Sequence, residues 1–106
     1  MALWLVVGVL AACSMPASAE QGAVQKRGEA LLMTNCARCH AVGRTGDSPR
    51  PGAPRFRTLS GKYPIESLAE ALGQGLSVGH EDIPEFVFDP ADVGAILDYL
   101  KSIQER

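Results

Sequence analysis

Several features that would indicate a large, membrane-spanning or nucleic-acid-binding protein are missing from this sequence. The chain has 106 residues, no internal repeat and no segment with the alternating pattern of a β-strand, so one small domain without a sheet is expected. Its apolar run over residues 3–12 is too short to cross a bilayer. The formal net charge is only −2 and no known nucleic-acid-binding motif is present, so nucleic acid is not an expected partner.

The apolar run has about the length of the central region of a secretory signal peptide. Residues 17–19 (Ala-Ser-Ala) follow it and match a small-residue cleavage site, although no lysine or arginine precedes the run. We expect residues 1–19 to be a signal peptide that is removed and residues 20–106 to form the mature domain. In the alternative, residues 10–13 (Leu-Ala-Ala-Cys) act as a bacterial lipobox and Cys13 is lipidated. The leader before Cys13 would then be short, so cleavage after residue 19 is preferred.

Only three cysteines are present, and Cys36 and Cys39 are the two that would remain after removal of the signal peptide. With His40 they form a C-x-x-C-H pattern, which predicts covalent attachment of one c-type haem. Two thiols at this spacing can form thioethers with the two vinyl groups of one porphyrin, and His40 can then bind the iron as its proximal ligand. A mature domain of this size builds a marginal core, which a haem would complete.

Two interpretations of the same residues without haem are weaker. Cys36, Cys39, His40 and His80 could hold zinc, but adjacent ligands at positions 39 and 40 strain a tetrahedral site. The two cysteines could also form a thioredoxin-like redox pair, but no βαβ pattern surrounds them.

Apolar residues at three- and four-residue spacing predict three helices. The first covers residues 21–35, the second covers residues 64–74 with Pro64 as its first helical residue, and the third begins at an Asp89 cap followed by Pro90. The apolar residues expected on their buried faces are Val24, Leu31, Leu32, Ile65, Leu68, Ala69, Leu72, Val93, Ile96, Leu97, Leu100 and Ile103.

Two residues inside the first predicted helix have a particular interpretation. Gly28 interrupts the pattern at a cost of about 1 kcal/mol relative to alanine, which favours close approach by another helix at that point. Met33 is expected to fill the core.

Glycine and proline break up the segments between the predicted helices. Residues 42–63 contain seven of them and show no periodicity. A loop of this length is uncommon in a small domain unless it wraps something, and a flat cofactor is a sufficient reason. Phe56, Leu59 and Tyr63 are its apolar residues, and we expect them to pack on the edges of the porphyrin. A second loop covers residues 76–89.

The order of these features resembles that of the class I cytochromes c, in particular small bacterial periplasmic members with one haem. The resemblance covers the mature chain and implies an all-α, cytochrome c-like fold of three to four helices and long loops around one covalently attached haem. In this family the axial histidine donates a hydrogen bond to the carbonyl oxygen of a loop proline, for which Pro54 is the candidate. The first and last helices cross at small residues, which would place Gly28 against Tyr99.

The resemblance further implies a monomeric one-electron carrier in the periplasm, not an enzyme, with redox proteins of the periplasm or inner membrane as partners. Contact with a membrane is expected only through the signal peptide or through lipidation at Cys13. Residues 20–63 carry eight lysines and arginines against three acids, whereas residues 64–106 carry nine acids against two bases. This separation predicts a dipolar surface that orients docking, or else a merely solvated one.

The sequence departs from this family at the sixth iron ligand. The family normally uses a methionine from the second loop, but Ile83 stands at the expected position and no methionine follows Met33. Four outcomes are open: a five-coordinate iron with an apolar distal face, which is favoured, His80 as a second axial ligand, water or another exogenous ligand, or Met33. For His80, an exposed loop histidine near a haem propionate is slightly preferred, because His80 lies three residues from position 83.

The ligand set bears on function. Histidine and methionine together raise the potential of a haem relative to harder ligand sets, so loss of the methionine should lower it. An open sixth position would permit a ligand-binding or sensor protein, and the domain could also be a small haem subunit of a larger oxidoreductase.

Overall fold

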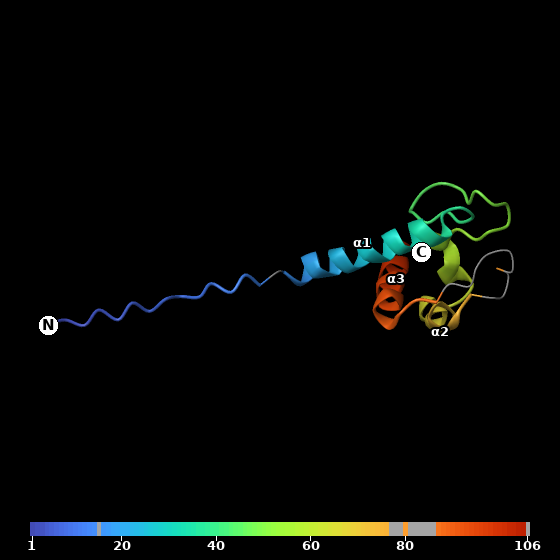
Figure 1. Ribbon diagram of the computed structural model, residues 1–106. Helices are drawn as coiled ribbons and strands as arrows, with labels where there is room; N and C mark the ends of the chain where they lie inside the picture. The colour runs from blue at the N-terminus through green and yellow to red at the C-terminus, as the bar shows by residue number, and fades with distance from the viewer. Residues whose placement is uncertain (15, 77–79, 81–86, 106) are drawn as a thin grey trace.

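The computed structural model describes residues 1–14, 16–76, 80 and 87–105. Three α-helices and two short 3-10 helices form the body of the protein (Figure 1). No strand occurs among these residues, so the prediction of an all-α fold is confirmed. None of the helices in the described part is both long and apolar enough to pass through a membrane. The elements in chain order are α1 (Ala17–Cys36), η1 (Phe56–Gly61), η2 (Ile65–Ser67), α2 (Leu68–Gln74) and α3 (Pro90–Ile103).

The N-terminal residues 1–14 extend away from this body, and their side chains are exposed (Figure 1). Helix α1 begins at Ala17, four residues before the predicted start, and its first turns have no helix packed on them (Figure 1). Val24 lies on this unpacked part and is exposed, so its assignment to a buried face was wrong. Met33 is also 53% exposed and does not fill the core as expected.

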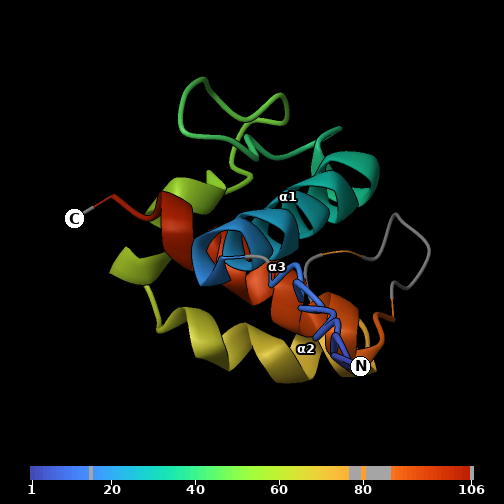
Figure 2. The same ribbon diagram turned by 90° about the vertical axis from the view of Figure 1, so that its left-hand side faces the viewer.

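Helices α1 and α3 cross at Gly28, and Figure 2 shows α3 lying across α1. Gly28 is buried, and a Cβ atom placed on it would lie only 2.6 Å from the carbonyl carbon of Ala95 and 3.0 Å from the amide nitrogen of Ile96. The predicted close approach is therefore present. We had expected the ring of Tyr99 to lie against Gly28. The atoms nearest to position 28 belong instead to the backbone of α3.

Helix α3 supplies half of the buried hydrophobic residues in the described part of the chain. Asp89 caps its N-terminus by accepting a hydrogen bond from the Asp92 amide at 2.9 Å, and Pro90 is the first helical residue, both as predicted. Hydrophobic side chains of α3 pack with Leu32 of α1, Leu72 of α2 and Phe56 of η1. The buried residues of α3 are Val93, Ala95, Ile96, Leu97, Tyr99, Leu100 and Ile103.

Two parts of the chain between α1 and α3 differ from the prediction. Pro64 is extended, with φ −61° and ψ 138°, and precedes the 3-10 turn η2, so it is not the first residue of an α-helix. Helix η1 lies inside the segment predicted as an irregular loop. A 3-10 helix of six residues is too short to give a detectable helical period in the sequence.

The C-terminal end of the chain holds η1 in place. The Gln104 side chain accepts a hydrogen bond from the Ser60 amide at 2.9 Å and donates one to the Phe56 carbonyl oxygen at 2.7 Å. The Glu105 amide donates to the Arg57 carbonyl oxygen at 2.8 Å. These contacts fix the backbone that carries Phe56.

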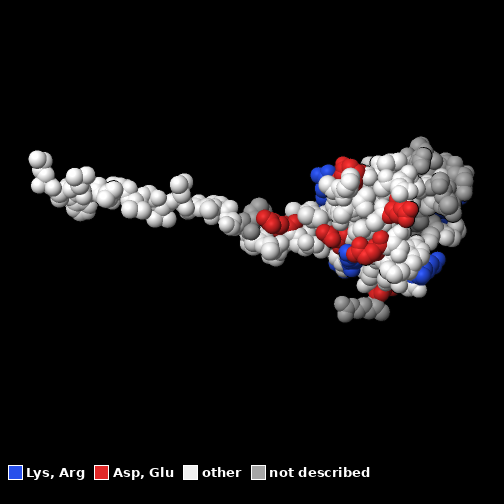
Figure 3. Space-filling model, turned by 90° about the horizontal axis from the view of Figure 1, so that it is seen from below, with Lys and Arg blue, Asp and Glu red and all other residues white. Residues whose placement is uncertain are grey.

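The charges of the two halves of the chain partly pair with each other. The Arg27 guanidinium of α1 binds the Asp92 carboxylate of α3, and the buried Arg57 binds Glu105 at 3.0 Å. Figure 3 shows one face of the molecule, with acidic side chains spread across it and basic side chains toward its edges. The separation of charge in the sequence is thus reduced by these ion pairs.

Candidate functional site

The last turn of α1 brings the two cysteines of the C-x-x-C-H segment to one side. Cys36 is the final residue of the helix, and its carbonyl oxygen accepts hydrogen bonds from the Cys39 amide at 3.2 Å and the His40 amide at 3.0 Å. The chain therefore continues in a tight turn, and the two thiols both line the same cavity. Both are free and half-buried, so no disulfide joins them.

His40 is held in a fixed orientation by two contacts. Its Nδ1 donates a hydrogen bond to the Pro54 carbonyl oxygen at 2.7 Å, which is the contact expected from the sequence. Its ring stacks on Phe56, with ring centroids 4.6 Å apart. The Phe56 amide in turn donates to the Ala41 carbonyl oxygen at 3.0 Å. A proton on Nδ1 leaves Nε2 of the neutral ring with a lone pair, the state in which histidine binds a metal.

These residues line a cavity of about 970 Å³ inside the helical body. That volume is at the upper end of the roughly 300–1,000 Å³ that is typical of cofactor sites. The cavity brings together all seven residues that the sequence singled out as a site: Cys36, Cys39, His40, Pro54, Phe56, Tyr63 and His80.

The sequence reasoning missed two groups of lining residues. The first is a set of aliphatic side chains that it assigned only to the buried faces of helices, together with Leu76, which it placed in a loop; of the aliphatic lining residues only Leu59 was expected to contact the porphyrin. The second is the pair Arg38 and Arg50. Together with Arg44, they are the basic residues between Cys36 and Pro51, and this closeness to the cysteines in sequence is the signal that could have identified them. The aliphatic residues of the lining are Leu32, Leu59, Leu68, Leu72, Leu76, Ile96 and Leu100.

His80 comes from the second loop and is half-buried in the same cavity. Its ring centroid lies 6.1 Å from that of His40, and the two ring planes are inclined by 26°. His80 is therefore less exposed than expected, and its location near a haem propionate stays a prediction. Met33, which was considered as a ligand, does not line the cavity and is exposed on α1. Ile83, the residue expected to replace methionine, lies outside the described residues.

The interpretations without haem are not supported. Burial raises the pKa of the Cys36 thiol to about 11, and the neighbouring Cys39 adds to the shift. A reactive thiol of a redox pair needs the opposite, a lowered pKa that stabilises the thiolate. Within the described part of the chain, no three side chains of histidine, cysteine, aspartate or glutamate come together so that they could hold a metal ion without haem.

The cavity has the chemical features that a covalently bound haem requires. Cys36 and Cys39 offer two thiols at its wall, His40 offers a ring nitrogen, and aliphatic side chains of all three α-helices surround the remaining space. Arg38 and Arg50 also line it and can balance the carboxylates of a haem. The residues present therefore fit the group that the sequence predicted.

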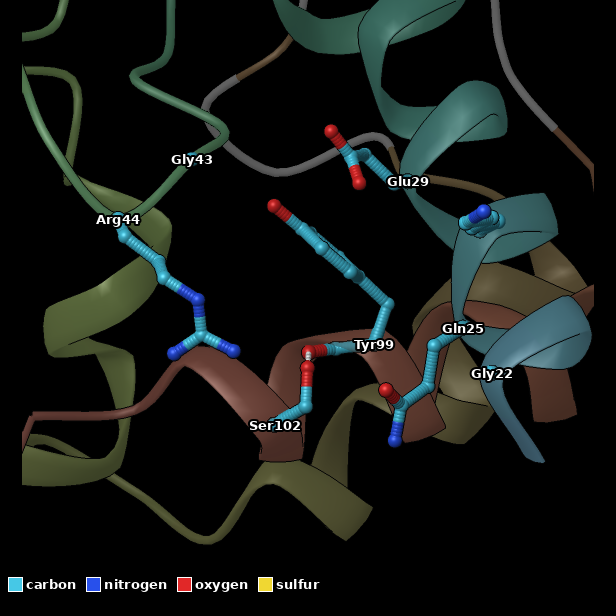
Figure 4. A pocket seen from close by; sticks show the side chains of 8 residues that line it. Gly22, Gln25, Glu29, Gly43, Arg44, Tyr99 and Ser102 are labelled. Atoms are coloured by element: carbon cyan, nitrogen blue, oxygen red, sulfur yellow. Dashed lines mark hydrogen bonds between the residues drawn. The ribbon is translucent and has the colours of Figure 1, made fainter. Parts of the chain in front are cut away.

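A second, smaller pocket of about 420 Å³ lies between α1, α3 and the loop at Gly43 and Arg44 (Figure 4). Tyr99 rises from α3 between Glu29 and Arg44, and its hydroxyl donates a hydrogen bond to the Val42 carbonyl oxygen at 2.9 Å. Burial raises the pKa of Tyr99, the Glu29 carboxylate raises it further, and the Arg44 guanidinium opposes the shift. Because Val42 follows His40 by two residues, this bond anchors the chain that leaves the site.

Replacing Tyr99 with phenylalanine is expected to lower the free energy of unfolding at neutral pH by about 1 kcal/mol, because the buried Val42 carbonyl loses its donor. The unfolded chain releases the tyrosine proton at about pH 10, before the folded chain does. The stabilisation from Tyr99 is thus fully present below that pH and is lost as pH rises through the raised pKa. Denaturant unfolding of both proteins over a range of alkaline pH tests this. The free energy of unfolding should fall less steeply with rising pH in Tyr99→Phe than in the unsubstituted protein, and an equal fall in both would contradict the prediction.

Comparison with known proteins agrees with this site. The family model described as Cytochrome c matches residues 25–104, which include the C-x-x-C-H segment and all described helices except the start of α1. A search of the curated proteins gave no significant match. A search of the solved structures likewise gave none.

Proposed function

Because the chain belongs to the cytochrome c family, whose members bind haem c covalently, we propose that it is a small one-electron carrier with a single haem held by Cys36, Cys39 and His40. The family match supports a haem-binding electron-transfer protein of the class I type. The observation that supports the three residue roles is the cavity itself. Two thiols and an oriented histidine line one largely aliphatic space.

Each of these residues has a role that follows from its contacts. A bound haem supplies an iron that changes its charge by one electron. The thiols of Cys36 and Cys39 would hold the porphyrin covalently. The hydrogen bond from His40 Nδ1 to Pro54 fixes the ring and makes Nε2 a better electron donor. Phe56 packs on the ring of His40 and helps to exclude water from this side.

No group of this chain needs to transfer a proton or form a bond to substrate in this function. An electron carrier requires a fixed haem, a partner surface and little movement of the ligands on changing charge. The family is generally one of electron transfer, and we accordingly propose a carrier and not an enzyme. We propose redox proteins of the periplasm or inner membrane as its partners and a monomer as its working form.

We also propose that the protein is exported to the periplasm after removal of residues 1–19. Residues 1–14 and 16–19 are exposed, and the first buried residue of α1 is Gly28, so removal of these described residues of the leader takes away no core residue. Lipidation at Cys13 is the alternative, and the exposed Cys13 does not discriminate between the two. The mass of the protein recovered from a bacterial periplasm would decide between cleavage after Ala19 and lipid attachment.

The alternatives of a ligand-binding sensor or a haem subunit of a larger oxidoreductase rest on replacement of the usual methionine by Ile83. A sensor requires an open distal side of the haem. The position of His80 inside the cavity favours the carrier, because this side chain competes with an external ligand for the same space.

Expression together with haem-maturation enzymes tests the proposal. We expect the purified protein to carry one haem that stays with the polypeptide after extraction with acidified acetone. Its pyridine complex should have the absorption of a haem with both vinyl groups saturated. Protein without a Soret band, or a haem that is fully extracted, would contradict the proposed function.

A further inference from the structure

We propose that His80 is the second axial ligand of the haem iron, on the side opposite His40. This inference rests on the proposed function, since it requires a haem held at Cys36, Cys39 and His40. It identifies the ligand that replaces methionine. Neither Ile83 nor the exposed Met33 is then needed for the ligand set.

The separation of the two histidine rings fits one iron atom between them. A nitrogen–metal bond to histidine is about 2.0 Å long and the nitrogen lies roughly 1.2 Å from the ring centroid, so two rings on opposite sides of one iron have centroids about 6.4 Å apart. The centroids of His40 and His80 are 6.1 Å apart. The inclination of 26° between the planes is also compatible with two rings that share one axis through the iron.

The spacing of the rings differs between the two ring partners of His40. Phe56 stacks on His40 with centroids 4.6 Å apart, whereas the ring of His80 is 1.5 Å farther away. A separation of 6.1 Å lies within the range of ring pairs in contact. The assignment of an iron between the two histidines therefore rests on the cavity that both line together with Cys36 and Cys39.

The surroundings of both rings support the same assignment. Both histidines line the cavity that contains the two cysteines, so a porphyrin bound through these thiols would pass between them. His80 reaches this position from the loop after α2, and His40 from the turn after α1. The loop after α2 lies in the same place in the chain as the loop from which this family normally supplies its distal methionine.

Two histidine ligands would have consequences for the carrier. Nitrogen is a harder ligand than the sulfur of methionine, so the reduction potential is lower than that of a member with methionine. The sixth position is closed in both oxidation states, which prevents external ligands from binding without prior loss of His80. The electron is then transferred without exchange of a ligand.

Absorption and electron paramagnetic resonance spectra of the mature, haem-loaded protein test this proposal. We expect low-spin iron in the ferric and ferrous forms, no absorption near the red end of the spectrum from a methionine–iron bond, and a ferrous form that does not bind carbon monoxide. His80→Ala should lose the low-spin bands and bind carbon monoxide, and added imidazole should restore the low-spin spectrum. His80→Met should keep low-spin iron but raise the reduction potential.

Val87→Ala is the matched control, because Val87 lies in the same connection and is exposed. It should keep the spectra of the unsubstituted protein. A haem-loaded protein with high-spin iron, or a His80→Ala spectrum identical to that of the unsubstituted protein, would overturn the assignment of His80 but leave the proposed function intact. Absence of covalent haem would overturn both.

Discussion

Gly28→Ala is expected to lower the free energy of unfolding by about 2–3 kcal/mol, although alanine is the better helix former by about 1 kcal/mol. The added methyl group would overlap the Ala95 carbonyl oxygen and lie 2.6 Å from the carbonyl carbon of the same residue. Both atoms belong to the backbone of α3 and cannot move unless the whole helix moves. The crossing of α1 and α3 would therefore have to open, and the core of α3 with it.

Gly94→Ala is the matched control for this prediction. Gly94 also lies inside a helix, one residue before Ala95, but no atom lies within 4 Å of the place where its Cβ would be. The same substitution there should raise the free energy of unfolding by up to about 1 kcal/mol. Thermal unfolding of the haem-loaded proteins would show opposite shifts of the midpoint. A neutral or stabilising Gly28→Ala would mean that the helices do not cross this closely.

Replacing both Cys36 and Cys39 with alanine is expected to abolish covalent haem attachment and to leave a chain without a cooperative unfolding transition. The cavity of about 970 Å³ lies among the side chains that form the core, including Leu32, Leu72 and Ile96. Without the cofactor, these side chains lose the partner on which they pack. A domain of this length has too little other buried surface to compensate.

Met33→Ala provides the control, because Met33 lies on the same helix as Cys36 but is exposed and does not line the cavity. It should retain haem in a denaturing gel stained for haem and should keep its thermal transition in circular dichroism. The double variant should show neither. A cooperative transition in the double variant would show that the helical body is stable without haem, and haem staining in that variant would contradict the assignment of the thioethers.

The local pattern of the sequence predicted the existence of the three α-helices and the turn that carries Cys36, Cys39 and His40. Residues at three- and four-residue spacing defined the buried face of α3, and the Asp89 cap set its start. The C-x-x-C-H spacing alone placed both thiols and His40 on one turn. These features depend on neighbours within about four residues, which is the range over which a helix fixes its own geometry.

The sequence failed where the environment of a residue depends on distant parts of the chain. Val24 and Met33 have the character of core residues, but the described part of the chain leaves both exposed on α1. Gly28 indicated a close approach without identifying what approaches, and its neighbour is the α3 backbone and not Tyr99. The helix η1 was missed because it is too short to show a helical period and because hydrogen bonds with the side chain of Gln104, more than forty residues away, hold it in place.

By itself, then, the sequence predicted a covalently attached haem and brought Cys36, Cys39 and His40 together, because these residues lie on one turn. Which side chain faces His40 across the cavity was decided only by the tertiary structure. His80 is separated from His40 by forty positions in the chain, and its spacing from Ile83 suggested an exposed residue. The packing of α2 and α3 around the cavity brings its ring to 6.1 Å from that of His40, a relation that no local pattern encodes.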